Sequence, residues 1–361
     1  MSIPADLPFD LPARTAVRQI RGSIRGISPA RQPMAGFEDR FSDIVDYIVR
    51  ITDEIWQDRA VGYIYDTYSA DCVVYTSYGI VRTAKQVTAN TVAAIASAPD
   101  SETTHLAVAW DGDEQAGFYT AHLGFDEVTH VSDNIYGPAT GRRYTMRFAA
   151  DCISLANKIH TEWLVRDNGA IVRQLGFDLD EVAQRVAQQP VAEPYSPAAA
   201  DRDAPAGGSV GAWARALFDT AWNARRLDRL GEWYADDVEV HSGGAREIQG
   251  RRALADHILK LIASIPDGVV RVENVCWSAE ADGIIVAVRW LLQGTSARGG
   301  LLGNLLPVGR EVYMMDCAGI GRTPPTGRRR LRPSKRCSTI LERIFTTPTK
   351  SSGLRASGTT T

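Results

Sequence analysis

Apolar residues recur three and four positions apart between Phe41 and Trp56, a spacing that places them on one face of a helix. Two further helices are expected over 60–70 and 84–97, the second ending before Pro99. Helices set apart from a run of antiparallel strands are typical of an α+β domain, in which a curved sheet wraps over a few helices. The expected strands lie near 72–76, 105–110, 118–127, 142–155 and 158–167.

Two proline-rich segments interrupt these patterns. Residues 1–36 contain five Pro and five Arg without a sustained apolar period, which predicts a disordered arm. Residues 188–210 combine four Pro with Ala, Asp and Gly, a composition that cannot pack a core and therefore predicts a linker. The expected division is a disordered arm (1–40), a first domain (41–187), a linker (188–210), a partial second domain (211–316) and a basic disordered tail (317–361).

The two sides of the linker repeat each other. Ordered matches that continue over many residues are more specific than a short motif, so we interpret the chain as a tandem duplication. The offset grows from 166 to 168 through two single-residue shifts. The matched pairs are Trp56 with Trp222, Tyr68 with Tyr234, Asp71 with Asp237, Trp110 with Trp277 and Gly141 with Gly309.

The second copy departs from the first after Met315. Where the first copy has its last two long strands, the second has glycines, prolines and a run of arginines. A sheet without two central strands leaves its neighbours unpaired, so the second copy is expected to be incomplete and to depend on the first. A truncation or a shifted reading frame would explain the change.

Charge is distributed unevenly along the chain, although the formal net charge is only -3. Residues 318–361 hold ten Lys or Arg and one acid, so the tail is basic and the remainder is acidic. A basic tail can bind nucleic acid or anionic lipid through counterion release. Phe345 is its only aromatic residue, however, and a nucleic-acid partner is therefore disfavoured.

Hydropathy and cysteine content indicate a cytoplasmic protein. No stretch of about 18–20 apolar residues is present, and the N-terminal segment lacks the apolar core of a signal peptide, so we expect no membrane insertion. The five Cys are scattered and include no Cys-x-x-Cys, which argues against a disulfide framework or a zinc site. The motifs of nucleotide-binding loops, zinc proteases and serine hydrolases are also absent from the sequence.

Several segments together resemble one family, the SnoaL-like polyketide cyclases of the nuclear transport factor 2-like superfamily. The resemblance implies two tandem cone-shaped α+β domains, each a curved antiparallel sheet wrapped over helices. The segments that carry it are Thr129–His130, Gly137–Arg142 and Asp151–Asp167 in the first copy, and Tyr234–His241, Gly250–Arg251, Ile265–Asp267 and Val288–Trp290 in the second.

The family's cyclases close a ring by an intramolecular aldol reaction, which the resemblance implies here. A single carboxylate in an apolar pocket can take a proton from carbon and return it to oxygen, so neither a metal nor a cofactor is expected. Asp151 matches the family's acidic position, and His130 matches its imidazole. Strict alternation from Arg142 instead puts Asp151 on a solvated face, unless a bulge at Ala149–Ala150 reverses it. His130 could equally cap a loop.

Other side chains are candidates for substrate binding. His122 and His160 fit a surface or interface position as well as a site, and the tryptophans fit a core as well as a cavity wall. The expected substrate-binding residues are Trp56, Trp110, His122, Glu162 and Trp163.

Two functions remain open from the sequence. The first is a cofactor-independent cyclase, isomerase or dehydratase acting on a small hydrophobic carbonyl compound. The second is a non-catalytic small-molecule-binding or dimerisation module. In either case the two copies are expected to pack on each other as a pseudo-dimer, or the chain to form a homodimer, because the superfamily commonly dimerises.

Overall fold

The computed structural model describes residues 31–189, 193, 208–280, 283–302, 308–322 and 337–346. Domain A denotes residues 31–189, and domain B denotes the described residues from 208 to 346. The elements of domain A are α1 (Ile44–Thr52), the π-helical turn η1 (Asp53–Gln57), the 3-10 turn η2 (Val61–Tyr63), α2 (Ile64–Thr67), β1 (Tyr68–Thr76), β2 (Gly79–Arg82), α3 (Ala84–Ser97), β3 (Glu102–Asp113), β4 (Gly117–Thr129), β5 (Arg143–Leu155), β6 (Lys158–Arg166), α4 (Asn168–Leu175) and α5 (Leu179–Ala187).

Domain B repeats this order of elements. Its first helix continues into a π-helical turn, as α1 does, and its second helix follows a short hairpin. The elements are α7 (Gly208–Phe218), η3 (Asp219–Asn223), η4 (Leu227–Glu232), β7 (Glu239–Ser242), β8 (Arg246–Gln249), α8 (Arg251–Ser264), β9 (Val269–Glu280), β10 (Gly283–Thr295), β11 (Glu311–Arg322) and β12 (Cys337–Thr346).

The strands form one twelve-stranded sheet in the order β2-β1-β6-β5-β4-β3-β9-β10-β11-β12-β7-β8. Each half contains six strands, and the two halves are in mirror order about the junction of β3 with β9. Trp110 pairs with Trp277 at this junction, so two residues matched by the sequence repeat meet each other. Equivalent residues in contact are the mark of a two-fold arrangement.

The second copy is more complete than the sequence suggested. β11 continues to Arg322, and β12 pairs with β11 in antiparallel and with β7 in parallel orientation. In domain A, β6 makes the same two pairings, with β5 and β1. The expectation that domain B lacks its last two strands is therefore wrong. An uncovered β11 would expose a row of unpaired backbone groups, and the β-branched and aromatic residues of 337–346 supply the strand that pairs with it.

The expected arm, linker and tail fall largely outside the described residues. Those parts are residues 1–30, most of 190–207, and 323–336 and 347–361. Residues 31–40, which we assigned to the disordered arm, pack on domain A instead. Phe37 is buried and meets Tyr47 and Phe118 edge to face, with ring centroids 5.0 and 5.8 Å away. The sequence did not predict this contact, because the proline-rich composition around Phe37 indicated disorder.

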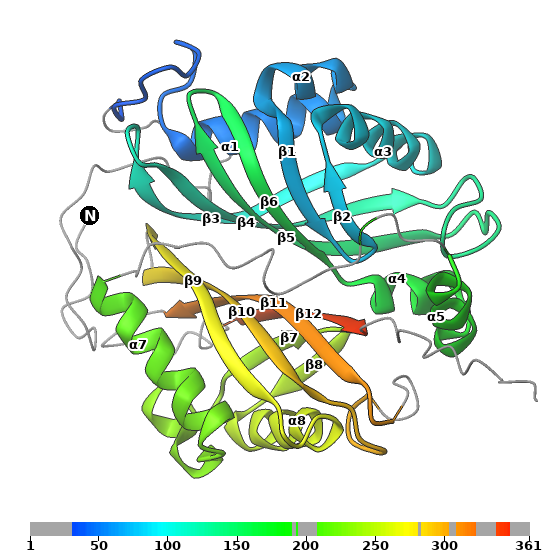
Figure 1. Ribbon diagram of the computed structural model, residues 1–361, viewed down its shortest axis with the longest axis vertical. Helices are drawn as coiled ribbons and strands as arrows, with labels where there is room; N and C mark the ends of the chain where they lie inside the picture. The colour runs from blue at the N-terminus through cyan, green and yellow to red at the C-terminus, as the bar shows by residue number, and fades with distance from the viewer. Residues whose placement is uncertain are drawn as a thin grey trace, which may run out of the picture.

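The two sheet halves pack against each other, with the helices on their outer sides (Figure 1). α1, α2 and α3 cover the half formed by β1–β6, whereas α7 and α8 cover the half formed by β7–β12. Between the sheets lies an apolar layer contributed by both domains, including Tyr75, Tyr119 and Trp163 from domain A and Leu291 and Tyr313 from domain B. Each half-sheet therefore has one face toward its own helices and one toward the other domain.

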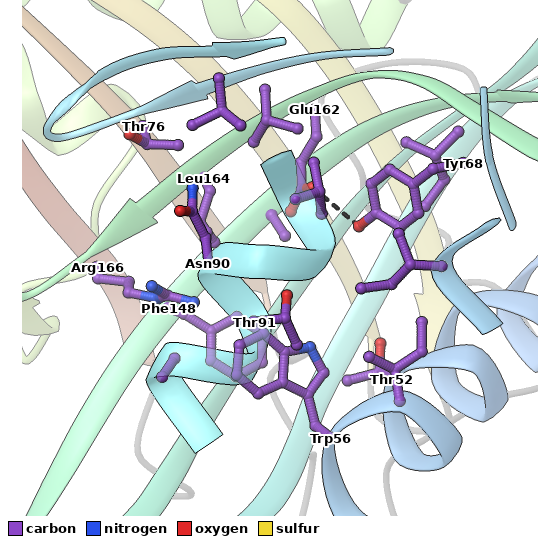
Figure 2. A pocket seen from close by; sticks show the side chains of 18 of the residues that line it. Thr52, Trp56, Tyr68, Thr76, Asn90, Thr91, Phe148, Glu162, Leu164 and Arg166 are labelled. Carbon is purple, nitrogen blue, oxygen red and sulfur yellow. Dashed lines mark hydrogen bonds between the residues drawn. The ribbon is translucent and has the colours of Figure 1, made fainter. Parts of the chain in front are cut away.

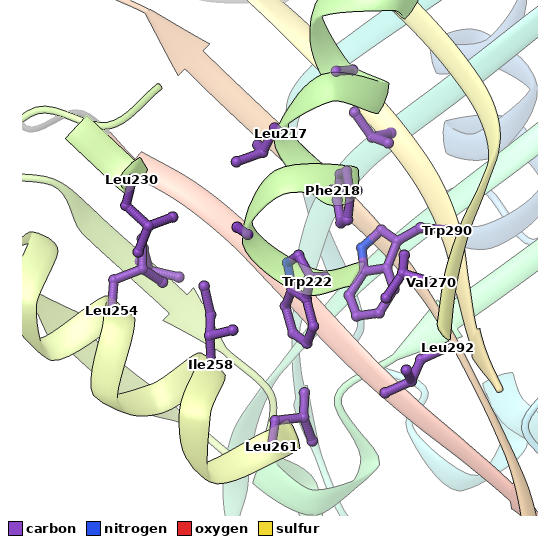
Figure 3. Packing of buried hydrophobic residues seen from close by; sticks show 14 of the residues in the cluster. Leu217, Phe218, Trp222, Leu230, Leu254, Ile258, Leu261, Val270, Trp290 and Leu292 are labelled. Atoms are coloured by element: carbon purple, nitrogen blue, oxygen red, sulfur yellow. The ribbon is translucent and has the colours of Figure 1, made fainter. Parts of the chain in front are cut away.

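Domain B is filled by aromatic side chains between its sheet and helices. Trp290 lies 5.1 Å from Trp222 and 5.5 Å from Phe218, measured between ring centroids, and all three are buried (Figure 3). The strand pairing shows which residues are equivalent in the two domains. Thr120 pairs with Trp110 in domain A, and Val286 pairs with Trp277 in domain B. Gly124 and Trp290 each lie four residues further along their strands, so Trp290 occupies the position of Gly124. Trp290 thus fills a point of domain B at which domain A has a glycine with the Phe148 ring packed against it.

Candidate functional site

Domain A contains a cavity of about 570 Å³ between its helices and the inner face of its sheet. Apolar side chains of α1, η1 and β5 form most of one wall, including Ile51, Trp56 and Phe148. A mostly apolar cavity with a few polar groups is the usual form of a small-molecule site. Its polar lining comprises Thr52, Tyr68, Thr76, Ser77, Tyr78, Gln86, Asn90, Thr91, Thr103, His122, Asp126, Glu162 and Arg166.

Glu162 lies at one end of this cavity and is paired with Tyr68. The Tyr68 hydroxyl donates to the Glu162 carboxyl across 3.0 Å, as the dashed line in Figure 2 shows. Burial raises the pKa of Glu162, and the hydrogen bond from Tyr68 opposes this only in part. Burial also raises the pKa of Tyr68 well above its ordinary value. Burial therefore shifts this carboxyl toward its protonated form, the form that can donate a proton into the cavity.

His122 lies on β4 and reaches the cavity from the sheet. Its Nε2 is 2.9 Å from Nδ1 of His105, and Nε2 of His105 is 2.8 Å from Oδ1 of Asp53. Burial, and then the neighbouring His105, lower the pKa of His122 well below its ordinary value. His122 therefore stays neutral, and among the described residues its side chain makes one hydrogen bond, through Nε2 to His105, which leaves Nδ1 without a partner there.

Arg166 and Asp126 lie at the other end of the cavity. Arg166 makes no ion pair with a described side chain, its Nε lacks a hydrogen-bond partner, and its guanidinium lies 5.8 Å from the Trp56 ring centroid. Thr103 donates to Asp126 across 2.7 Å. Burial raises the pKa of Asp126, which the Thr103 hydrogen bond and Arg166 oppose. Figure 2 shows Arg166 on the opposite side of the cavity from Tyr68. Arg166 is therefore placed to attract an oxygen of a ligand.

Pairing in the sheet fixes the spacing of these groups. His122 faces Ala150, which faces Leu164, so His122 lies two strands away from β6 and midway between the levels of Glu162 and Arg166. With about 4.8 Å between strands and about 3.3 Å per residue, the His122 Cα lies roughly 12 Å from that of either residue. A ligand of a few fused rings spans such a distance.

Asp151 lies on the opposite face of the sheet and does not line the cavity. The bulge that we considered at Ala149–Ala150 is absent, because β4 and β5 pair without a register shift there. The outward face is not solvated, however, since domain B covers it. Asp151 is 1% exposed, and its carboxylate lies 3.4 Å from Arg289 of domain B. Its contact is thus an ion pair between the domains.

His130 is separated from both Asp151 and the cavity. It is fully buried, its Nδ1 lies 3.2 Å from the Thr140 hydroxyl, and its backbone pairs with Gly141 and Arg142. These contacts close the loop between β4 and β5, as the loop-capping alternative predicts. The structure does not bring His130 and Asp151 together in one site.

The expected substrate-binding residues divide into two groups. Trp56, His122 and Glu162 line the cavity. Trp110 lies in the core at the junction of the domains, and Trp163 stacks on Tyr75 at a centroid distance of 5.4 Å between the sheets. His160 is exposed. Three of the five candidates therefore line the cavity, and so do Tyr68, Asp126 and Arg166, which our sequence reasoning did not single out.

The repeat itself contained a signal for one of the missed residues, Asp126. At the matched positions, His122 and Asp126 are replaced in domain B by Val288 and Leu292. Alternation along β6 puts Arg166 on the same face as Glu162. A polar residue in one copy opposite an apolar residue in the other marks the copy whose interior stays hollow.

The described ranges contain neither a metal-binding cluster nor a membrane-spanning helix. No group of three or more His, Cys, Asp or Glu there has an arrangement that could hold a metal ion. Among the described helices, none has both the length and the apolar character needed to span a membrane.

The architecture is that of an α+β protein made of cone-shaped domains around a curved sheet. Residues 214–331 match the family described as the SnoaL-like domain. This segment, about a third of the chain, is therefore similar to a SnoaL-like domain. The match runs past Met315, where we expected the repeat to end.

Solved structures of similar fold each cover about the length of one domain. IdmH from Streptomyces antibioticus is 19% identical with a TM-score of 0.32, over 37% of this chain and 97% of its own. A SnoaL-like polyketide cyclase from Agrobacterium tumefaciens is 22% identical with a TM-score of 0.31, over the same two shares. TsrD from Streptomyces laurentii is 14% identical with a TM-score of 0.33, over 37% and 97%. No curated protein matches the chain.

Proposed function

We propose that domain A is a cofactor-independent acid–base enzyme that acts on a small hydrophobic carbonyl compound, as a cyclase, isomerase or dehydratase. The observation that supports this most strongly is the set of groups in one cavity. A neutral imidazole, a guanidinium without an ion pair to a described side chain and a buried carboxyl of raised pKa line the same space. A base, a group that stabilises the enolate oxygen and a proton donor each lower the barrier to proton transfer next to a carbonyl.

Each group has a distinct part in the proposed reaction. Nδ1 of His122 takes the proton from the carbon beside the carbonyl, and the Arg166 guanidinium stabilises the negative oxygen of the enolate. Glu162 donates a proton to the second oxygen, which is the accepting carbonyl of an aldol step or the leaving hydroxyl of a dehydration. Asp151 and His130, which the family resemblance favoured, have no part in this proposal because neither lines the cavity.

Deuterium exchange tests the proposal without knowledge of the substrate. The full-length protein is incubated in D₂O with a panel of bicyclic and tricyclic aromatic ketones and β-diketones, and mass spectrometry follows exchange at the carbon beside the carbonyl. We expect the protein to accelerate exchange for some members of the panel. His122→Gln should reduce this acceleration by about 10²- to 10⁴-fold, the usual contribution of a general base.

Two control variants separate chemistry from folding. His160→Gln changes an exposed histidine of β6, and Glu127→Gln changes a carboxylate on the outward side of β4; both should retain exchange. Glu162→Gln should retain ligand binding, measured by calorimetry, while the complete reaction is lost. Ketones that bind in the cavity without any exchange would contradict the enzyme and favour the alternative of a non-catalytic binding module.

A further inference from the structure

A chain of three side chains leads from the cavity of domain A toward the surface. His122 lines the cavity, the His105 side chain behind it is 1% exposed, and the Asp53 side chain at the start of η1 is 31% exposed. The links are the 2.9 Å contact between the two imidazoles and the 2.8 Å contact from His105 to Asp53. Gln57 also donates to Oδ1 of Asp53, which holds the carboxylate in place.

The hydrogen bonds determine which nitrogen of each ring carries a proton. A carboxylate can only accept, so Nε2 of His105 carries the hydrogen that it donates to Asp53. A neutral His105 then accepts at Nδ1, and Nε2 of His122 must donate to it. Nδ1 of His122 is left with its lone pair free, on the residue that lines the cavity.

We propose that Asp53, His105 and His122 form a proton relay, in which His122 exchanges a proton with the ligand and His105 stores it beside the Asp53 carboxylate. This proposal rests on the proposed function of the cavity. As the ligand's C–H bond breaks, an N–H bond forms at Nδ1 of His122. The proton on Nε2 of His122 moves to Nδ1 of His105, and the electron pair of the C–H bond remains on the ligand as an enolate.

The relay solves a problem that His122 alone would have. A positive charge on this imidazole is strongly disfavoured, because burial lowers its pKa well below the ordinary value. Passing the second proton to His105 leaves His122 neutral and places the charge 2.8 Å from a carboxylate. The charge therefore forms where an opposite charge already stands. His105 and Asp53 are positioning residues in this scheme, and only His122 touches the ligand.

Domain B retains one member of the chain. At the matched positions, Asp53 corresponds to Asp219, whereas the two histidines correspond to Val272 and Val288. Asp219 accepts from Asn223 within its own turn. The carboxylate at this position is thus compatible with a local structural role, and the two imidazoles are the members of the chain that domain A has and domain B lacks.

Nuclear magnetic resonance of the full-length protein tests the relay directly. Two-bond correlations between carbon-bound protons and ¹⁵N in labelled histidine show which ring nitrogens are protonated. We expect Nε2 of both His105 and His122 to carry hydrogen, and Nδ1 of His122 to carry none. A His122 ring protonated at Nδ1 in the free protein would overturn the relay, because the cavity would then face a donor and not a base.

Asp53→Asn provides the matched perturbation. An amide no longer enforces one direction of hydrogen bonding, so the ¹⁵N shifts of His122 should move toward the average of protonated and unprotonated nitrogen. Asp58→Asn removes an exposed carboxylate five residues away and should leave those shifts unchanged. Identical spectra for the two variants would overturn the role of Asp53.

The exchange assay then connects the relay to the reaction. Asp53→Asn should slow deuterium exchange by about 100-fold, with ligand affinity unchanged, whereas Asp58→Asn should match the wild type. Failure of the tautomer pattern would overturn the relay even if exchange is observed. Wild-type protein that shows the tautomer pattern but exchanges no ketone would instead overturn the proposed function.

Discussion

At the scale of single residues, burial determines the charge of Glu162, and this has a measurable effect on stability. Its pKa is raised in the folded protein above the ordinary value of 4.5. Between these two values the folded state keeps a proton that the unfolded state has lost. The free energy of unfolding therefore falls as pH rises through this window.

Glu162→Gln should remove this dependence. The free energy of unfolding of the variant relative to wild type should increase as pH rises from about 4.5, by about 1.4 kcal/mol for each unit by which folding raises the pKa. Urea unfolding at intervals from pH 4.5 to 8 measures the difference. Tyr68→Phe removes the hydrogen bond that opposes the rise in the pKa of Glu162. In this variant the fall in the free energy of unfolding with rising pH should therefore continue to a higher pH than in the wild type. Parallel curves for wild type and Glu162→Gln would contradict the burial argument.

The residue scale also shows where prediction from the sequence was limited. Alternation along β5 assigned Asp151 to the outward face correctly, but sequence alone does not show what covers that face. Likewise, alternation along the strands predicts the face of the sheet on which His122 and Glu162 lie. The hydrogen bond between His105 and Asp53, in contrast, joins residues 52 positions apart. Contacts of this kind depend on how helix and sheet pack.

At the scale of elements, local patterns predicted domain A well. α3 spans the expected residues 84–97, and each expected strand of domain A is present within a few residues of its expected ends. In α3 and in these strands, the alternation of apolar and polar residues agrees with packing of one face on the core. β12 was missed because the basic, proline-rich sequence before it suggested a tail, and its pairing with β7 crosses about a hundred residues.

β12 provides the test at this scale. Thr339 pairs with Gly319 on one side and with His241 on the other, so this position lies between two strands. Thr339→Pro removes a backbone donor from the ladder and should destabilise domain B by about 1–3 kcal/mol, the usual cost of leaving a buried acceptor unsatisfied. Thr339→Ala keeps the N–H group and should cost much less. Equal unfolding midpoints for these two variants in urea would mean that β12 does not complete the sheet.

At the scale of the whole molecule, one domain is hollow and the other is filled. Trp290 stands where domain A has Gly124, at which an added Cβ would lie 2.6 Å from Phe148. Trp290→Ala should therefore destabilise domain B by about 3–5 kcal/mol and leave a cavity beside Trp222. Benzothiophene has the shape of the lost ring without its N–H group. It should raise the melting temperature of this variant by binding in the cavity. It should not stabilise domain B of the wild type, where Trp290 occupies that space. A variant that the compound does not stabilise would mean that the space collapses.

Arg289 joins the two domains and carries the last prediction. Its guanidinium lies 3.7 Å from the Trp163 ring centroid, 3.4 Å from Asp151 and 3.1 Å from Glu273, and all of these charged groups are buried. Arg289→Met leaves two buried carboxylates without this partner, which should cost about 3–5 kcal/mol. Because the loss falls at the contact between the sheets, calorimetry should resolve the single transition of the wild type into two.

Arg147→Met is the matched control for this interface. Arg147 also forms an ion pair with domain B, to Glu247 at 3.2 Å, but both side chains are partly exposed, and such a pair contributes less than about 1 kcal/mol. Adding Asp151→Asn to Arg289→Met should recover part of the lost stability, because it removes a buried negative charge that Arg289 no longer balances. If Arg289→Met and Arg147→Met unfold alike in one transition, the buried ion pair does not couple the domains, and the apolar layer around Tyr119 and Leu291 holds them together by itself.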